Sequence, residues 1–384
     1  MPRAEAGTGL ARRPQPGRGG EVIHRRLLIT NAGTGPTTSL VRSLRAGDPS
    51  LQLVGSHWDR FVLRSADLDA RYLTPHVDEP IYIEAVGRVA RESMADALIP
   101  NADPEVAVIS RYRDQLPCRV WLPSDDVVVL CQDKYDLAHH LRQRGVAAAK
   151  TVALTSLDDL ETAWERLGGP ARAWCRIRRG TGSRGATSVR DVEQARSWIE
   201  YWQTMRGVAP ALFTLSEYLP GRDYSCESLW KDGRLIVVKT TQRISYFGGG
   251  DRPSGVSSNA ALAKTVRDDR LVEITCAAVL ALSPTASGVF SLDMKEDEAG
   301  HPCVTEINIG RVFSTTALFD LVGKHNLALL YARLALGEDP DVWDEYDIEP
   351  DYYFVRELDR PPTILHADAL LDGVCDARAP ACRA

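Results

Sequence analysis

The sequence lacks the features that mark several large classes of protein. No apolar run approaches the ~20 residues that a membrane-spanning helix needs. Positive charge is not in surplus either, because the formal net charge is −6, whereas nucleic-acid binders usually carry a basic stripe. We therefore expect a protein without a nucleic-acid or membrane partner.

Common metal and nucleophile motifs are also missing. The eight cysteines include no Cys-x-x-Cys pair, and the eight histidines no His-Glu-x-x-His pattern. In a chain of this length we expect reduced, buried thiols and a cytoplasmic location. There is no Gly-x-Ser-x-Gly elbow and no Cys/His pairing, so we expect chemistry without a covalent protein intermediate.

The 384 residues suffice for two or three domains at ~150 residues each. Residues 1–22, rich in Gly, Pro, Ala and Arg, are predicted to be a disordered arm. This arm lacks the apolar core of a secretory signal, although its low acid content leaves a transit peptide open. We expect further divisions at 23–127, 128–212, 213–340 and 341–384, the last ending in a loosely ordered tail.

Short apolar runs alternate with helical patterns as far as residue 127. The predicted strands are 26–30, 51–54 and 97–100, and the predicted helices 37–46, 81–94 and 104–114. This alternation predicts a parallel sheet with helices on its faces. Beyond a helix at 133–145, hairpin turns at 230–234 and 297–301 indicate a partly antiparallel sheet. We expect helices at 268–282 and 315–336, and the last ordered strand at 352–356.

One predicted hairpin gathers oxygen-bearing side chains. Glu306 and Asn308 are two residues apart and therefore project from the same face of a strand. The turn at 297–301 brings Asp293 beside them. Hard oxygen ligands of this kind suit Mg²⁺, which keeps substrate phosphates and water in its other positions. Taken alone, the pattern also fits the polar face of an edge hairpin.

A glycine-rich turn at 180–185 joins two further strands. Its glycines allow backbone N–H groups to approach phosphate oxygens closely, and Arg176 and its neighbours add positive charge. The turn is not a Walker A loop, because no Gly-Lys-Ser/Thr follows. An ordinary hairpin with a basic tip remains the alternative.

A third segment, 215–225, is predicted to be a strand, a Pro-Gly turn and another strand. It places Glu217 and Asp223 at the two ends of a bend. Such a bend can offer carboxylates and backbone groups to an adenosine. A plain connector with solvated acids is the alternative.

The order of these three segments resembles the ATP-grasp superfamily, in particular its branch similar to the carbamoyl-phosphate synthase large subunit. The resemblance covers about residues 26–336. It implies an α/β protein with an ATP-grasp fold, two α+β subdomains clasping ATP, preceded by a Rossmann-like parallel α/β domain. Asp293, Glu306 and Asn308 are similar to the family's metal triad, so ATP and Mg²⁺ are the implied cofactors, with Mn²⁺ as a substitute.

The resemblance also implies nucleotide contacts. Glu217 would meet the adenine amino group, the backbone of Tyr218 and Leu219 the ring, and Asp223 the ribose hydroxyls. The implied phosphate contacts are Lys134, Arg176 and the loop residues Gly180, Thr181, Gly182 and Ser183.

Three basic residues are candidates for catalysis by the same resemblance. Arg311 follows the triad one position later than the family's usual arginine, close enough to reach an acyl phosphate. Lys239 and Arg243 lie on a strand that in the family directs basic residues toward the γ-phosphate. Arg176 stands where lysine is commoner, which keeps the charge but brings a planar fork.

The implied function is ligation, in which ATP activates a small-molecule carboxylate as an acyl phosphate that an amine then attacks. Amino-acid or peptide-like substrates follow from the resemblance, and a homodimer is the default expectation. A nucleotide-binding subunit without ligase activity, or a kinase that stops at the acyl phosphate or carbamate, remains open. The loop at 31–36 also suggests a Rossmann oxidoreductase. Its motif is incomplete, however, because Thr38 stands where the third glycine of Gly-x-Gly-x-x-Gly belongs.

Overall fold

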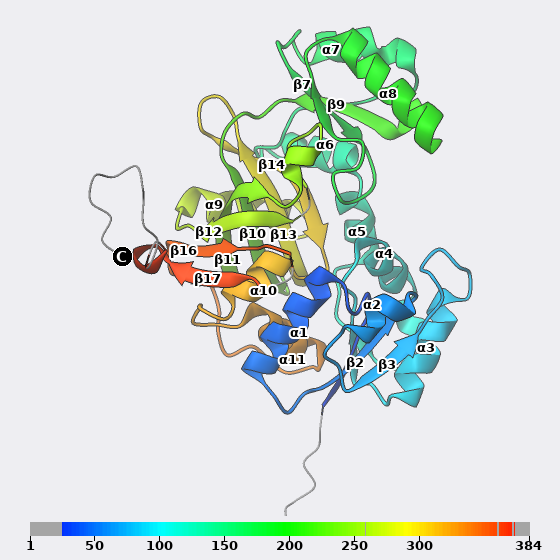
Figure 1. The fold of residues 1–384 in the computed structure, drawn as a ribbon, viewed down its shortest axis with the longest axis vertical. Coiled ribbons are helices and arrows are strands. Elements are labelled where there is room, and N and C mark those ends of the chain that lie inside the picture. The colour runs from blue at the N-terminus through cyan, green and yellow to red at the C-terminus, as the bar shows by residue number, and fades with distance from the viewer. Residues whose placement is uncertain (1–24, 258, 359–360, 371, 373–384) are drawn as a thin grey trace, which may run out of the picture.

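The computed structural model describes residues 25–257, 259–358, 361–370 and 372, and its strands form three separate sheets. Figure 1 shows a lower unit built on sheet A, a central unit built on sheet B and an upper lobe built on sheet C. The predicted arm at 1–22 and the tail beyond residue 372 lie outside the described residues. Short 3-10 helices cover Arg113–Gln115, Leu157–Asp159, Pro210–Leu212, Gly249–Asp251 and Ala367–Ala369.

Sheet A is parallel, with the strand order β3-β2-β1-β4-β5. Its strands are β1 (Arg26–Ile29), β2 (Gln52–His57), β3 (Ala70–Leu73), β4 (Ala97–Ile99) and β5 (Arg119–Val120). Its helices are α1 (Gly35–Gly47), α2 (Arg60–Arg64), α3 (Tyr82–Glu92) and α4 (Asp103–Tyr112). Leu27 and Ile29 of β1 enter the core shared with α1, whereas Leu28 enters the core shared with α3 and α4. The sheet is therefore buried on both faces, as its apolar strands require.

Sheet C is antiparallel, with the order β6-β9-β7-β8. Two helices, α5 (Asp125–Cys131) and α6 (Lys134–Gln143), lead into it from sheet A. Its elements are β6 (Thr151–Ala153), α7 (Leu160–Arg166), β7 (Ala173–Ile177), β8 (Thr187–Val189), α8 (Val192–Arg206) and β9 (Phe213–Glu217). Asp191 caps α8, and Gly207 ends it in the left-handed conformation that favours glycine.

Sheet B has the order β14-β13-β10-β11-β12-β16-β17, and β15 pairs with β11. Its strands are β10 (Asp223–Lys231), β11 (Arg234–Tyr246), β12 (Ala260–Thr265), β13 (Gly288–Glu296), β14 (Pro302–Ile309), β15 (Glu345–Tyr346), β16 (Tyr352–Val355) and β17 (Thr363–His366). Its helices are α9 (Asp269–Leu282), α10 (Ser314–Phe319) and α11 (Leu327–Ala335). Both predicted hairpins are present, as the antiparallel pairs β10–β11 and β13–β14.

Two sequence predictions in this region are wrong. The single helix expected at 315–336 is two helices, because Asn326 accepts a hydrogen bond from the Leu329 amide and starts α11 anew. The Asp320 side chain, just beyond α10, accepts a hydrogen bond from the Ala328 amide and so links the end of α10 to the start of α11. The strand at 352–356 is also not the last one, since β17 pairs with it in antiparallel register.

Candidate functional site

Asp293, Glu306 and Asn308 lie together on one face of the β13–β14 hairpin. Asp293 is directly opposite Glu306 in the strand register, and Asn308 lies two residues further along β14. The Asn308 amide nitrogen is 3.3 Å from Asp293 Oδ2. The alternation of β14 and the short turn before it therefore bring these side chains together as the sequence indicates.

Four cationic side chains surround this acidic pair. Lys134 Nζ and Arg176 Nη1 each lie 3.6 Å from Glu306 Oε2. Arg243 forms an ion pair with Asp293, and Arg311 Nη2 donates to Asn308 Oδ1 at 2.6 Å. The four cations come from α6, β7, β11 and the turn after β14, so elements of the upper lobe and the central unit both contribute.

The two facing carboxyl groups have opposite titration behaviour. Burial raises the pKa of Asp293, Arg243 opposes the rise, and the neighbouring Glu306 charge adds to it. Burial alone would also raise the pKa of Glu306, but the charges of Lys134 and Arg176 outweigh it and hold that pKa below its ordinary value. A further cation beside Asp293 would therefore favour its ionised form.

The chemistry of this donor set fits Mg²⁺ bound together with phosphates. Among the residues that the structure describes, no group of three or more His, Cys, Asp or Glu side chains could hold a metal by itself. Two carboxylates and one amide are too few for a cage made of protein alone, but they match an ion that takes its remaining ligands from phosphate and water. Asp293, Glu306 and Asn308 are the residues that would hold it.

The glycine-rich loop between β7 and β8 is held from two sides. Lys134 Nζ donates to the Gly180 carbonyl at 2.8 Å, and Arg252 donates to the Gly182 carbonyl at 2.9 Å. Gly180, Gly182 and Ser183 have φ values of 133°, 75° and 56°, which explains the glycines at the first two positions. Thr181 lies between them in the same turn.

Arg176 ties the upper lobe to the central unit. Its Nη2 donates to the Thr305 carbonyl of β14 at 2.8 Å, and its side chain is buried. By contrast, the neighbouring arginines of the predicted basic tip do not face the loop. Arg178 and Arg179 both bind the buried carboxylate of Asp133, which also caps α6, and Arg178 binds Asp136 as well, so their charges are largely offset.

The Pro-Gly turn joins two different sheets. Glu217 ends β9 of sheet C, and its Oε2 accepts from the Lys150 amide at 2.8 Å. Asp223 begins β10 of sheet B, where Tyr246 and Arg243 bind its carboxylate. Tyr218 lies in the turn beneath the Arg172 guanidinium, and Leu219 there is buried. The predicted bend is therefore the connection between the upper lobe and the central unit.

Lys239 does not join the cluster, which corrects the prediction that it faces a phosphate. It lies four residues before Arg243 on β11, so both side chains share one face of the strand. However, its ammonium is 2.6 Å from Asp347 and 3.4 Å from Asp320, and only 1% of the side chain is exposed. The segment after α10 covers this end of the strand and leaves the ammonium closed off from solvent.

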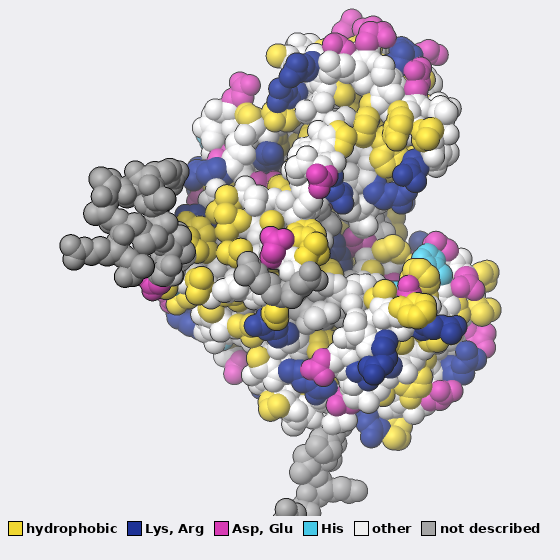
Figure 2. Space-filling model, viewed as in Figure 1, with side chains coloured by type: hydrophobic (Ala, Val, Ile, Leu, Met, Phe, Trp, Pro, Cys, Tyr) yellow, Lys and Arg dark blue, Asp and Glu magenta, His cyan; other side chains and the backbone are white. Residues whose placement is uncertain are grey.

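One residue of the site was missed from the sequence. Asp103, in the first turn of α4, binds the Arg311 guanidinium through Nε and, at 3.1 Å, through Nη2. Its place directly after β4, at the carboxyl end of a parallel strand, is the signal that could have found it. The contact brings the lower unit to the cluster, and Figure 2 shows the surface hollowed between that unit and the upper lobe.

No family model matches the sequence, and no curated protein does. Solved structures match well in shape. An L-amino acid ligase from Bacillus licheniformis matches with a TM-score of 0.64 and 14% identity, over 86% of this chain and 79% of that one. The biotin carboxylase domain dimer of 2-oxoglutarate carboxylase from Hydrogenobacter thermophilus was solved with MgADP and bicarbonate. It matches with a TM-score of 0.67 and 15% identity, over 86% of this chain and 73% of that one. An N5-carboxyaminoimidazole synthetase from Staphylococcus aureus with ADP matches with a TM-score of 0.64 and 12% identity, over 87% of this chain and 82% of that one.

The chain has the ATP-grasp fold. The predicted fold class is thereby confirmed, with the parallel sheet A preceding the two sheets of the ATP-grasp unit. The boundaries expected between domains and the roles expected for single residues stay predictions. No helix among the described residues is long and apolar enough to cross a membrane.

Proposed function

We propose that this protein is an ATP- and Mg²⁺-dependent ligase that joins a carboxylate to an amine through an acyl phosphate. The observation that carries the proposal is the acidic pair Asp293 and Glu306, which face each other among four cationic side chains. The ATP-grasp fold and its occurrence in an L-amino acid ligase support this reaction type. We take the substrates to be amino acids or peptide-like acids and amines.

In this proposal the chain's own residues position the reactants and balance charge. Lys134 and Arg176 bind the phosphates of ATP, while Asp293, Glu306 and Asn308 hold Mg²⁺, which supplies Lewis-acid neutralisation of the β- and γ-phosphates when bound. Arg243 binds Asp293, and Arg311 donates to Asn308. They stabilise the negative charge that spreads over the transferring phosphoryl group.

Two bond exchanges complete the reaction. A carboxylate oxygen of the substrate attacks the γ-phosphorus, the bond between that phosphorus and the β-γ bridging oxygen breaks, and ADP leaves. The amine then attacks the acyl carbon, inorganic phosphate leaves with the carbon–oxygen bond pair, and the amine proton passes to solvent. No covalent protein intermediate is needed, and catalysis rests on orientation and electrostatics.

The test is ADP and phosphate release from MgATP with a panel of amino-acid pairs. We expect release that depends on both substrates, and its loss in Asp293→Asn and Glu306→Gln. Glu298→Gln is the matched control, because Glu298 is exposed in the turn of the same hairpin. ATP binding without release by any pair would instead support a nucleotide-binding subunit.

A kinase that stops at the acyl phosphate is separated by trapping with hydroxylamine. The ligase yields hydroxamate only when the amine is withheld, whereas the kinase yields it regardless of any amine. The same assay with Mn²⁺ in place of Mg²⁺ tests whether the smaller ion is required. Since one matching structure is a dimer, we also propose a homodimer, which sedimentation analysis can check.

A further inference from the structure

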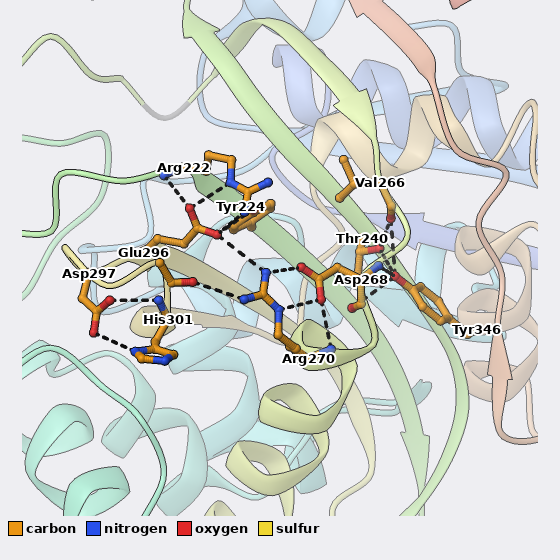
Figure 3. A network of polar contacts seen from close by, with 11 residues as sticks. Arg222, Tyr224, Thr240, Val266, Asp268, Arg270, Glu296, Asp297, His301 and Tyr346 are labelled. Atoms are coloured by element: carbon orange, nitrogen blue, oxygen red, sulfur yellow. Dashed lines mark hydrogen bonds and ion pairs between the residues drawn. The ribbon is translucent and has the colours of Figure 1, made fainter.

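The side-chain carboxylate of Glu296, the last residue of β13, accepts hydrogen bonds from Arg222 and Tyr224. Arg222 lies in the turn that joins the upper lobe to the central unit, and Tyr224 lies at the start of β10. Arg222 Nε donates to Oε2 at 2.9 Å, and Arg222 Nη2 donates to Oε1 at 2.7 Å, so the guanidinium and carboxylate meet as a two-bond fork. The Arg222 amide and the Tyr224 hydroxyl each add a bond at 3.1 Å. Figure 3 shows these groups converging on the one carboxylate.

The backbone of Glu296 holds the same turn. Its amide donates to the Arg222 carbonyl, and its carbonyl accepts from the Gly221 amide, both at 3.0 Å. A Cβ atom on Gly221 would lie 2.5 Å from Glu296 Cβ, so only glycine allows this approach. Residues 218–222 lie between β9 and β10 and belong to neither strand, so no strand pairing holds them. Their hydrogen bonds with Glu296 therefore fix their position against sheet B.

Charge and burial make this contact strong. Glu296 is buried, with 5% of its side chain exposed, whereas more than half of the Arg222 side chain is exposed. Burial alone would raise the pKa of Glu296, but the bonds from Arg222 and Tyr224 outweigh it and lower that pKa. Arg270 adds a more distant charge, 3.8 Å away, while it binds Asp268 at the start of α9.

We propose that Glu296 is a positioning residue for the nucleoside half of ATP. It holds the turn at 218–222, where by the family resemblance the Leu219 backbone would meet the purine ring and Asp223 the ribose. This inference rests on the proposed function, because it assumes that ATP lies between the two lobes. Asp293 lies three residues earlier on the same strand, so one strand sets the distance between the nucleoside and the phosphate end of the site.

The phosphate end has separate supports. Lys134 and Arg176 come from α6 and β7, and neither makes a contact with Glu296 among the described residues. Loss of the Glu296 carboxylate should therefore weaken recognition of the nucleoside and leave recognition of a polyphosphate unchanged. A residue that only stabilises the fold would affect both or neither.

The experiment measures binding of MgATP and of magnesium tripolyphosphate by calorimetry, and KM for ATP against kcat. We expect Glu296→Gln to weaken ATP binding and raise its KM about tenfold, the loss of about one charge-assisted hydrogen bond. Tripolyphosphate affinity and kcat at saturating ATP stay at the wild-type values. Glu298→Gln, the same change two residues further on at an exposed position, is expected to alter nothing.

A second variant covers the case in which Glu296→Gln does not fold. Arg222→Gln breaks the same fork from its exposed side, and the double variant is expected to lose no more ATP affinity than either single one. The inference is overturned if the wild type binds ATP and the variants bind it equally well, or lose ATP and tripolyphosphate alike. A wild type that binds no ATP overturns the proposed function itself, which is a distinguishable result.

Discussion

Arg311 and Asp103 form an ion pair across 208 positions of the sequence, and the same guanidinium donates to Asn308. Asp103 lies at the start of α4 in the lower unit, and Asn308 on β14 of the central unit. The orientation of the Arg311 side chain, one of the proposed catalytic cations, thus depends on the lower unit as well as on sheet B.

Replacement of Arg311 by Lys should lower kcat about 100-fold, the effect of losing one preorganised charge donor at a transition state. Lysine keeps the charge but cannot bind Asp103 and Asn308 at once through a planar fork. Asp103→Asn should lower kcat less, because the arginine remains and only its orientation is loosened. The measurement is kcat with a productive substrate pair at saturating ATP.

The control for that series is Asp114→Asn, an exposed carboxylate just beyond the same helix. It should leave kcat unaltered. Equal losses in Asp103→Asn and Asp114→Asn would mean that Arg311 needs no partner in the lower unit.

Gly310 allows the backbone turn after β14 that carries Arg311. Its φ is +73°, and a Cβ there would lie 2.9 Å from side-chain atoms of both Leu122 and Val106. Gly310→Ala should therefore destabilise the protein by about 2–4 kcal/mol, the sum of a left-handed alanine and overpacking. Gly145→Ala is a matched control, since its φ is +77° and no atom lies within 4 Å of the added carbon. Urea denaturation should show the larger loss at Gly310, and equal losses would contradict this assignment.

Lys239 is expected to matter for stability, because its buried ammonium forms ion pairs with Asp347 and Asp320. Lys239→Met leaves those carboxylates uncompensated and should cost about 3–5 kcal/mol. Lys324→Met removes an exposed partner of Glu345 and should cost less than about 1 kcal/mol. Thermal unfolding of the two variants measures the difference, and a Lys239→Met protein as stable as the wild type would refute the buried ion pair.

The raised pKa of the buried Glu227 side chain should make the stability of the protein depend on pH. Burial raises its pKa from 4.5 to about 8, and bonds from Ser291 and the Phe313 amide oppose the rise only in part. The folded protein therefore holds a proton that the unfolded chain releases above pH 4.5. The contribution of Glu227 to stability should be greatest below that pH and should be lost as pH rises toward about 8.

Glu227→Gln imitates the protonated side chain and should flatten this dependence. Urea midpoints at several values between pH 5 and 8 compare the two proteins. Other buried acids, such as Glu105 with a pKa of about 7, titrate in both and cancel in the comparison. Parallel slopes for the wild type and the variant would show that Glu227 is ionised in the folded state.

Local patterns determined much of this protein. The alternation of β14 placed Glu306 and Asn308 on one face, because side chains in a strand repeat every two residues. The short turn at 297–301 then placed Asp293 opposite Glu306. Alternating apolar strands and helices likewise specified the parallel sheet A. Each of these inferences depends only on residues that are near neighbours in the chain.

Only the tertiary structure separated Arg243 from Lys239. Both lie on the same face of β11, but the segment after α10 folds over one and leaves the other beside Asp293. The ion pair of Arg311 with Asp103 was likewise decided by a contact between distant segments. The physical reason is that periodicity reports the face on which a side chain lies, whereas its partner and its burial depend on which remote segment packs there.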